Sequence, residues 1–354
     1  MKKVKSVFLI ANDYGESRCL ESISKELKER GYQTTDFFGF GKAHLVLTDE
    51  VVQQALKTDL LVTAISEYNK TEVELAVVVR KQNPSMPSAV YAPGRYAFRN
   101  AGAVPLRDMA NFLFIGNNDE LKEAVNTYLL ARVSAVGNIL HEEFHPAMSV
   151  EEARQKAGVE NSQKLIFVPG DKRLGINWPL FHSVIEAAHR NIVKKFSPLV
   201  AIGIHPGDNT YKPELYEDAN KFSRDVPVKI FTRDVLSSSV LVTACDLMVT
   251  AVSSLATAAA FQRKPVIGFY FENLLIELER AQEGRKFEWE PERDMVAEVV
   301  RYGSVDLLAE AIARLLTPHG FRAMKALQEY HYPSPPVHGS TAKKIVDILE
   351  NSGY

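Results

Sequence analysis

Two adjacent serines, Ser253 and Ser254, separate an apolar run, LMVTAV (247–252), from an alanine-rich run at 255–262. The first run predicts a buried parallel strand and the second a helix. Either serine can cap that helix, whose first-turn N–H groups and positive dipole end then face outward at the carboxyl end of the strand. This arrangement suits a diphosphate, and the alternative is that the serines only cap the helix.

Further polar residues stand where neighbouring strands are expected to end. Apolar runs at 165–169, 199–204 and 228–231 predict strands of the same sheet, and phosphate ligands bind beyond the carboxyl ends of such strands. Together with the serines, the residues predicted to contact a phosphate donor are Lys172, Arg173, His205, Thr232, Arg233, Ser253 and Ser254. Lysine and arginine offer charge-assisted hydrogen bonds, and histidine can donate to a phosphate oxygen. The alternatives are solvated loop charges and a structural histidine.

The elements that hold these residues alternate between strand and helix along the whole chain. In the N-terminal half, strands are expected at 7–11, 34–38, 60–65, 88–92, 112–115 and 133–136. The same rhythm restarts after residues 137–150. Repeats of this kind make parallel sheets with helices over both faces. We therefore predict an α/β protein of two Rossmann-like, doubly wound domains facing a cleft, at 1–139 and 140–335, with a closing helix within 336–354.

The second half also resembles a known superfamily. The order of acidic residue, apolar strand, Ser-Ser, helix and Lys-Pro, seen as Asp246, Ser253-Ser254 and Lys264-Pro265, resembles the donor-binding half of GT-B glycosyltransferases. It is also similar to that of the non-hydrolysing UDP-GlcNAc 2-epimerases and the CDP-glycerol glycerophosphotransferases. Other segments agree in order, and these are VGN (136–138), VPGDKR (168–173), IHP (204–206) and HGSTAKKIVDIL (338–349).

The resemblance implies roles for the first domain. GT-B relatives place the base that activates the acceptor in the turn after the first strand, here NDYGESR (12–18), so Asp13 and Glu16 are the candidates for removing a proton from an acceptor hydroxyl. The alternative for Asp13 is turn and N-cap chemistry. Arg95 is a candidate for holding an acceptor phosphate, and surface exposure is its alternative. The relatives' last helix crosses back onto the first domain, and the same is expected here.

Two departures from these relatives bear on the reaction. Most of the nucleotide-sugar enzymes have a carboxylate, which holds the ribose hydroxyls, where this chain has Ala258. The epimerases carry acidic residues and an arginine-containing loop after the last core strand, where this chain has FYFEN (269–273). Glu272 is the candidate substitute, and 2-epimerase chemistry is disfavoured.

A rival motif spans the expected linker. His141-Glu142-Glu143-Phe144-His145 matches the HExxH pattern, in which two histidines on a helix bind zinc and the glutamate acts as base. His145 precedes Pro146, and a residue before proline avoids the helical region, so the helix that would align both histidines ends too early. No third ligand is evident. We therefore expect no metal site here.

Composition limits the partners. The formal net charge of −2 and the pI of about 6.5 leave no overall electrostatic footprint for nucleic acid or an anionic membrane. No stretch approaches the roughly 20 apolar residues of a membrane span, so a cytoplasmic location is expected. Cys19 and Cys245 fit neither a disulfide framework nor a zinc spacing.

Together these features predict a metal-independent GT-B glycosyltransferase, which moves a sugar or related group from a nucleotide-activated donor to an acceptor that the sequence does not specify. The nucleotide-sugar donor is a substrate, and no cofactor is expected. The alternatives are a nucleotide-sugar epimerase or hydrolase, and a non-catalytic nucleotide-binding protein on the same scaffold. Ala258 makes the last alternative more credible.

Overall fold

The computed structural model of the chain describes residues 5–40, 45–65, 70–94, 97–99, 101–146, 148–171, 174–205, 225–232, 234–281, 289–332 and 334–353. The chain divides into two compact units. The first contains Met1–Glu143 together with Pro336–Tyr354, and the second contains Phe144–Pro335. The sequence placed the boundary after residue 139, whereas the units divide after Glu143.

The first unit is built on a six-stranded parallel sheet. Its strands are β1 (Ser6–Ala11), β2 (Gln33–Phe38), β3 (Leu60–Ala64), β4 (Ser88–Ala92), β5 (Phe112–Ile115) and β6 (Arg132–Ala135). They lie in the order β2-β1-β3-β4-β5-β6. The chain first runs outward from β1 to β2 and then returns past β1 to β3. The strand order therefore reverses between β1 and β3, which is where ligands bind in open sheets of this kind.

Helices cover both faces of this sheet. They are α1 (Tyr14–Glu29), α2 (Asp49–Leu56), α3 (Lys70–Gln82), α4 (Val104–Arg107), α5 (Leu121–Thr127) and α16 (Ser340–Asn351). Val7 and Leu9 of β1 belong to a core that includes residues of α1 and α16, whereas Phe8 and Ile10 point into a core with α2, α3, α4 and α5. This alternation is the period of two that a strand buried on both faces requires.

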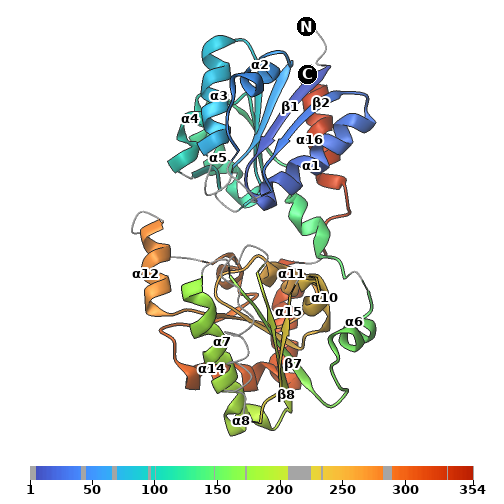
Figure 1. The fold of residues 1–354 in the computed structure, drawn as a ribbon, viewed down its shortest axis with the longest axis vertical. Coiled ribbons are helices and arrows are strands. Elements are labelled where there is room, and N and C mark those ends of the chain that lie inside the picture. The colour runs from blue at the N-terminus through green and yellow to red at the C-terminus, as the bar shows by residue number, and fades with distance from the viewer. Residues whose placement is uncertain are drawn as a thin grey trace. The chain divides into compact units, whose positions relative to one another are not determined.

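The C-terminal helix α16 packs beside α1 in the first unit (Figure 1). Glu142, from the short 3-10 helix at Ile139–Phe144, accepts hydrogen bonds from the backbone N–H groups of Gly339 (2.7 Å) and Thr341 (2.8 Å) at the start of α16. Near the other end, Arg30 forms ion pairs with Asp347 and Glu350, both at 2.7 Å. A buried carboxylate therefore satisfies the free N–H groups of the first turn, and ion pairs hold the last turns.

The second unit repeats the architecture with a different strand order. Its strands are β7 (Lys164–Pro169), β8 (Pro198–Gly203), β9 (Val228–Phe231), β10 (Leu247–Thr250), β11 (Val266–Phe269) and β12 (Glu298–Val300). All are parallel, in the order β12-β11-β10-β7-β8-β9, so this sheet reverses between β7 and β10. Taken in chain order from β7, this is the 3-2-1-4-5-6 arrangement of a Rossmann sheet.

The described helices of this unit form two layers. They are α6 (Val150–Ala157), α7 (Leu174–His189), α8 (Asn191–Lys194), α10 (Ser238–Ala244), α11 (Leu255–Phe261), α12 (Glu272–Ala281), α13 (Glu290–Arg293), α14 (Val305–Leu315) and α15 (Pro318–His331). Helix α14 packs on α7 and α8, whereas α10 packs on α6 and α11 (Figure 1). Cys19 and Cys245 are free and buried, one in each unit.

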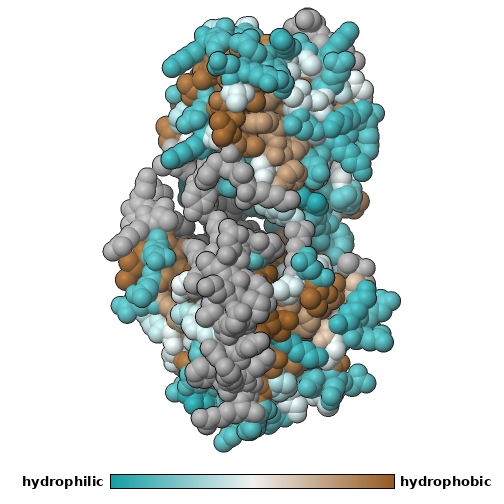
Figure 2. Space-filling model, viewed as in Figure 1, coloured by the Kyte–Doolittle hydropathy of each residue, from teal (hydrophilic) through white to brown (hydrophobic). Residues whose placement is uncertain are grey.

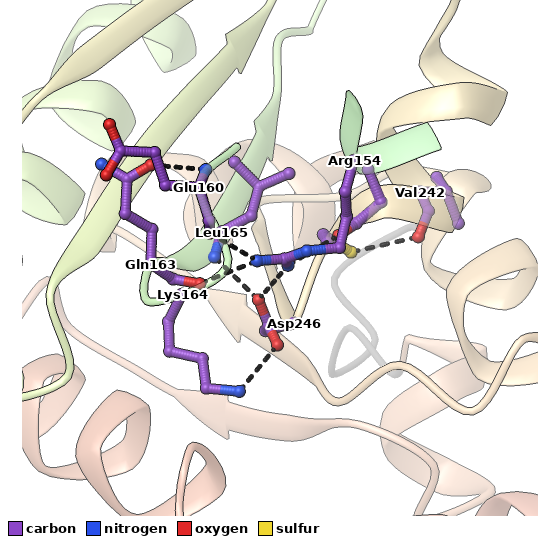
Figure 3. A network of polar contacts seen from close by, with 9 residues as sticks. Arg154, Glu160, Gln163, Lys164, Leu165, Val242 and Asp246 are labelled. Carbon is purple, nitrogen blue, oxygen red and sulfur yellow. Dashed lines mark hydrogen bonds and ion pairs between the residues drawn. The ribbon is translucent and has the colours of Figure 1, made fainter. Parts of the chain in front are cut away.

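Asp246 joins neighbouring elements at the amino-terminal edge of the second sheet. Asp246, before β10, accepts from the Leu165 N–H at 2.9 Å and forms ion pairs with Arg154 (2.8 Å) and Lys164 (3.0 Å), as Figure 3 shows. Its own N–H donates to the Leu165 carbonyl at 2.9 Å. Asp246 thus ties β10 to β7 and α6, at the end of β10 opposite to the serines. It is a structural residue, outside the candidate site.

The surfaces of the described parts are mixed. Figure 2 shows hydrophilic residues over much of the visible surface of each unit, with hydrophobic residues reaching it in smaller areas. No described helix combines the length and the apolar character needed to cross a membrane. In the sequence, the helical spacing of apolar residues predicts one apolar face made of Leu121, Ala124, Val125, Tyr128 and Leu129. The structure buries Ala124 and Tyr128 and leaves Leu121, Val125 and the following Leu129 exposed.

Candidate functional site

The carboxyl-terminal edge of the second sheet carries five of the residues predicted from the sequence. His205 lies two residues beyond β8, Thr232 directly follows β9, and Ser253 and Ser254 lie between β10 and α11. Glu272 begins α12, after β11. Because all these strands are parallel, their following residues share one edge. Lys172 and Arg173, between β7 and α7, and Arg233, after β9, lie outside the described residues.

The end of β7 approaches β8 too closely for a side chain. The Gly170 N–H donates to the Gly203 carbonyl at 2.7 Å. A Cβ placed on Gly170 would lie 2.9 Å from that carbonyl oxygen and 3.3 Å from the His205 nitrogen. Glycine is therefore required by space at this position. It brings the β7–α7 connection against the segment that carries His205.

Asn177 fixes the connection between β7 and α7, and sequence reasoning missed it. Its side chain is 1% exposed. Its Oδ1 accepts from the Asp171 N–H at 2.6 Å, and its Nδ2 donates to the Asp171 carbonyl at 2.8 Å. The two bonds tie the backbone of Asp171, which precedes Lys172 and Arg173 in the sequence, to α7. The available signal was an asparagine soon after a strand-ending glycine, and asparagine commonly bonds nearby backbone in such loops.

The serine pair only partly fulfils the expected cap. Ser254 occupies the N-cap position of α11, but its side chain makes no capping hydrogen bond. The Ser253 hydroxyl instead accepts from the Leu255 N–H at 3.2 Å. Ser254 is exposed and Ser253 half-buried. The first turn of α11 therefore opens toward the same edge as His205, with one of its N–H groups bonded to Ser253.

The two residues connected with ribose binding differ in their surroundings. Ala258 lies inside α11 and is 4% exposed, so it packs in the core and offers no polar group. Glu272 is exposed at the first position of α12. It lies on the strand-end side of β11, the neighbour of β10 in the sheet. Glu272 and Asp171 thus follow the two strands that pair with β10 on either side.

The carboxyl-terminal edge of the first sheet holds both predicted base candidates. Asp13 occupies the N-cap position of α1 and makes no side-chain capping bond, and Glu16 lies in the first turn of the same helix. Both are half-buried. The predicted alternative for Asp13, an N-cap hydrogen bond, is therefore not formed. Arg95 lies outside the described residues, and the nearby Arg99 pairs with Glu123 of α5.

A third carboxylate at this edge has no counterpart in the sequence reasoning. Glu72, in the first turn of α3, is fully buried. Its Oε1 accepts from the Asn12 N–H at 2.7 Å, at the point where β1 ends. Burial raises the pKa of Glu72, and the negative charge of Asp13 adds to this, against the opposing effect of the Asn12 hydrogen bond. Helical spacing on α3 gave no signal for it, because Glu72 looked like one more polar first-turn residue.

The HExxH segment has a structural role in the first unit. His141 to Phe144 lie in the 3-10 helix in which Glu142 binds the start of α16, as described above, and His145 follows the end of that helix. His141 approaches the Asn138 amide at 3.3 Å, and burial lowers its pKa to about 4. Within the described part of the chain, no three His, Cys, Asp or Glu side chains gather where they could hold a metal ion.

Comparison by sequence finds no protein-family model and no curated protein that matches this chain. Comparison by structure finds several proteins. UDP-GlcNAc 2-epimerase from Neisseria meningitidis, bound to UDP-GlcNAc, has a TM-score of 0.64 at 14% identity, with 98% of this chain and 100% of that chain covered. MurG from Acinetobacter baumannii has a TM-score of 0.61 at 12% identity, with 98% of this chain and 99% of that chain covered. The wall teichoic acid polymerase TagF has a TM-score of 0.57 at 14% identity, with 99% of this chain and 89% of that chain covered.

These similarities extend over nearly the whole chain, and they confirm the predicted fold. The protein has the GT-B type of architecture, with two six-stranded parallel sheets flanked by helices. The superfamily resemblance drawn from Asp246, Ser253-Ser254 and Lys264-Pro265 is confirmed at the level of fold. The similar structures are those of enzymes. At 14% identity or less, the likeness is one of fold.

Proposed function

We propose that the protein is a glycosyltransferase that moves a sugar or related group from a nucleotide-activated donor to an acceptor hydroxyl. One observation carries the proposal: Gly170, His205, Thr232 and Ser253 follow four parallel strands at the reversal-point edge of a Rossmann-ordered sheet. Nucleotides bind at such edges. Structures with bound UDP-GlcNAc and UDP are among the similar folds, which supports a nucleotide diphosphate as the ligand.

In the proposed reaction, the acceptor oxygen attacks the anomeric carbon and the bond from that carbon to the diphosphate oxygen breaks. Negative charge then develops on the leaving diphosphate. Fixed hydrogen-bond donors at this edge stabilise that charge, and we propose that Lys172, Arg173 and His205 supply them together with the serine pair. No divalent ion is then required. Asp13 or Glu16 of the first unit accepts the proton of the acceptor hydroxyl.

Ribose recognition needs a different residue from the one that relatives use. A buried alanine at 258 offers no hydrogen bond to a hydroxyl pair. We propose that Glu272 takes this contact, because it is exposed at the end of the strand next to the serine pair. Glu272→Gln would then weaken binding of a nucleoside diphosphate and leave inorganic pyrophosphate binding unchanged.

The first test is calorimetric titration of the full chain with UDP-, CDP-, GDP- and dTDP-sugars, each with and without EDTA. We expect one nucleotide class to bind, and to bind equally well with EDTA. Release of the nucleoside diphosphate from that donor in the presence of candidate hydroxyl acceptors then measures transfer. Absence of binding to all four classes would contradict the proposal and favour a non-catalytic protein.

A second candidate is a nucleotide-sugar epimerase or hydrolase. It is favoured by the TM-scores of 0.64 for two UDP-GlcNAc 2-epimerase structures, compared with 0.61 for MurG and 0.57 for TagF. The FYFEN segment (269–273), which differs from the epimerase pattern, stands against it. Incubation of the bound donor with no acceptor distinguishes the two. Loss of the sugar's original NMR signals in that mixture would favour the second candidate.

A further inference from the structure

Three segments meet in a closed ring of hydrogen bonds at the reversal point of the first sheet. The Asn12 N–H, just after β1, donates to Glu72 Oε1 at 2.7 Å. The neighbouring Thr71 hydroxyl donates to the Leu45 carbonyl at 3.2 Å. The Leu45 N–H donates to Asn12 Oδ1 at 3.1 Å, which completes the circuit. The ring thus joins the end of β1, the first turn of α3 and the segment before α2.

The packing around the ring leaves little freedom to Asn12. The Gly39 N–H donates to the Ala11 carbonyl at 2.9 Å. A Cβ on Gly39 would lie 2.7 Å from the Asn12 carbonyl oxygen and 2.8 Å from its Oδ1. The segment after β2 therefore presses directly on Asn12. Asp13 is the next residue, and its backbone position follows from that of Asn12.

Glu72 is the charged member of this ring. It is fully buried, and its Oε2 has no hydrogen-bond partner within the part of the chain that the structure describes. A buried carboxylate with an unsatisfied oxygen costs stability compared with an apolar side chain, because it is removed from water without full compensation. Glu72 also lies close enough to Asp13 for the two charges to interact. Stability alone does not account for such a residue.

We propose that Glu72 is a positioning residue: through the Asn12 N–H it fixes the turn that presents Asp13 to the acceptor hydroxyl. This rests on the proposed function, in which Asp13 is a candidate base. A general base must lie within hydrogen-bond reach of the proton that it removes, and a displacement of about 1 Å can lower a rate about 100-fold. Glu72 does not itself touch the acceptor, because its side chain is fully covered.

The same strand provides a matched control. Asp59 lies at the amino end of β1, where its Oδ2 accepts from the N–H groups of Lys5 and Ser6, both at 3.0 Å, and from the Ser6 hydroxyl at 2.8 Å. Asp59→Ala removes a carboxylate that bonds the backbone of β1 at the opposite end from Asp13. It therefore reports what a purely structural loss in this unit does.

The experiment compares Glu72→Ala, Glu72→Gln and Asp59→Ala with the parent protein. Hydrogen exchange of a peptide covering residues 11–17, thermal unfolding, and kcat and donor KM of transfer are measured. We expect both alanine variants to lose thermal stability. Only Glu72→Ala should exchange faster in 11–17 and lose about 10- to 100-fold in kcat, with an unchanged donor KM. Glu72→Gln keeps an acceptor oxygen, so it should retain most of the parental protection from exchange in 11–17 and most of the parental kcat.

Equal kcat in Glu72→Ala and Asp59→Ala, or unaltered exchange in 11–17, would overturn the proposal. If Glu72→Ala does not fold, Glu72→Met removes the acceptor for the Asn12 N–H while keeping most of the buried side-chain volume. Faster exchange in 11–17 with a lower kcat then supports the proposal, and parental values overturn it. A parent protein that turns over no nucleotide-activated donor would overturn the transfer function, and hydrogen exchange would still decide whether Glu72 holds the turn.

Discussion

The two sheets share one device at their amino-terminal edges and differ at their carboxyl-terminal edges. Asp59 and Ser6 exchange backbone and carboxylate hydrogen bonds at the start of β1, as Asp246 and Leu165 do at the start of β7. In each sheet the aspartate precedes the strand that pairs with the first strand across the reversal point. At both amino-terminal edges, an aspartate therefore joins the two strands that flank the reversal point.

The opposite edges carry different chemistry. Asp13, Glu16 and Glu72 place carboxylates at the first edge, the first two half-buried and Glu72 fully buried. The second edge holds the hydrogen-bond donors His205, Thr232 and Ser253 together with the carboxylate of Glu272. A topology of parallel strands fixes where a ligand can bind, and the loops that follow the strands decide its charge. This contrast is the physical basis for assigning proton acceptance to the first unit and diphosphate binding to the second.

The largest expected effect would break the assignment of the first edge. Asp13→Asn or Glu16→Gln should lower transfer by roughly 100-fold or more for whichever residue is the base, because proton acceptance is lost. The affinity for the donor, measured by calorimetry, should stay nearly unchanged, because the proposed diphosphate contacts lie in the other unit. Full turnover in both variants would mean that neither carboxylate is the base.

The next effect concerns stability of the first unit. Glu142→Ala removes the buried carboxylate that binds the first turn of α16 and leaves the N–H groups of Gly339 and Thr341 unsatisfied. We expect a loss of about 3 kcal/mol in the free energy of unfolding, measured with denaturant. Glu142→Gln keeps one acceptor oxygen and should lose less. If His141 and His145 instead bound zinc, adding zinc would stabilise the parent and not His145→Ala.

Sequence reasoning found the elements and missed the residues that hold them together. Strands such as 88–92 and 112–115 match the structure because apolar runs bounded by polar turns leave few alternatives. Asn177 and Glu72 were missed because each acts on backbone groups whose position exists only after folding. Leu129 was expected to continue the apolar face of α5, but that helix ends at Thr127, and the side chain is 80% exposed. Asp246 precedes its strand as the motif order predicts, and it therefore lies at the end of β10 opposite to the serines.

A smaller effect tests the second edge. Ser254→Ala combined with Arg173→Ala should weaken donor binding by about 30-fold, which is about 2 kcal/mol, because one charge-assisted contact and one hydroxyl are lost. The matched control is Lys194→Ala, which removes an exposed cation of the same unit that pairs with Asp225. That variant should bind the donor as the parent does. A folded double variant with parental affinity would show that the diphosphate site lies elsewhere.

The smallest effect would sharpen the comparison. It asks whether Asn177 fixes the backbone at the second edge as we propose that Glu72 does at the first. Asn177→Ala removes both bonds to the backbone of Asp171, a half-buried residue that follows β7. Water can replace part of what is lost, so we expect the free energy of unfolding to fall by about 1 kcal/mol. Donor affinity should fall several-fold, because Lys172 and Arg173 would no longer be presented by a fixed loop, and ordering that loop would then cost part of the binding free energy.

Asn177→Asp keeps the acceptor for the Asp171 N–H and loses the donor to its carbonyl, so its stability and donor affinity should lie between those of the parent and the alanine variant. Calorimetry on both variants measures this order. An alanine variant that loses stability but keeps parental donor affinity would restrict Asn177 to folding and leave the positioning of the basic pair to other contacts.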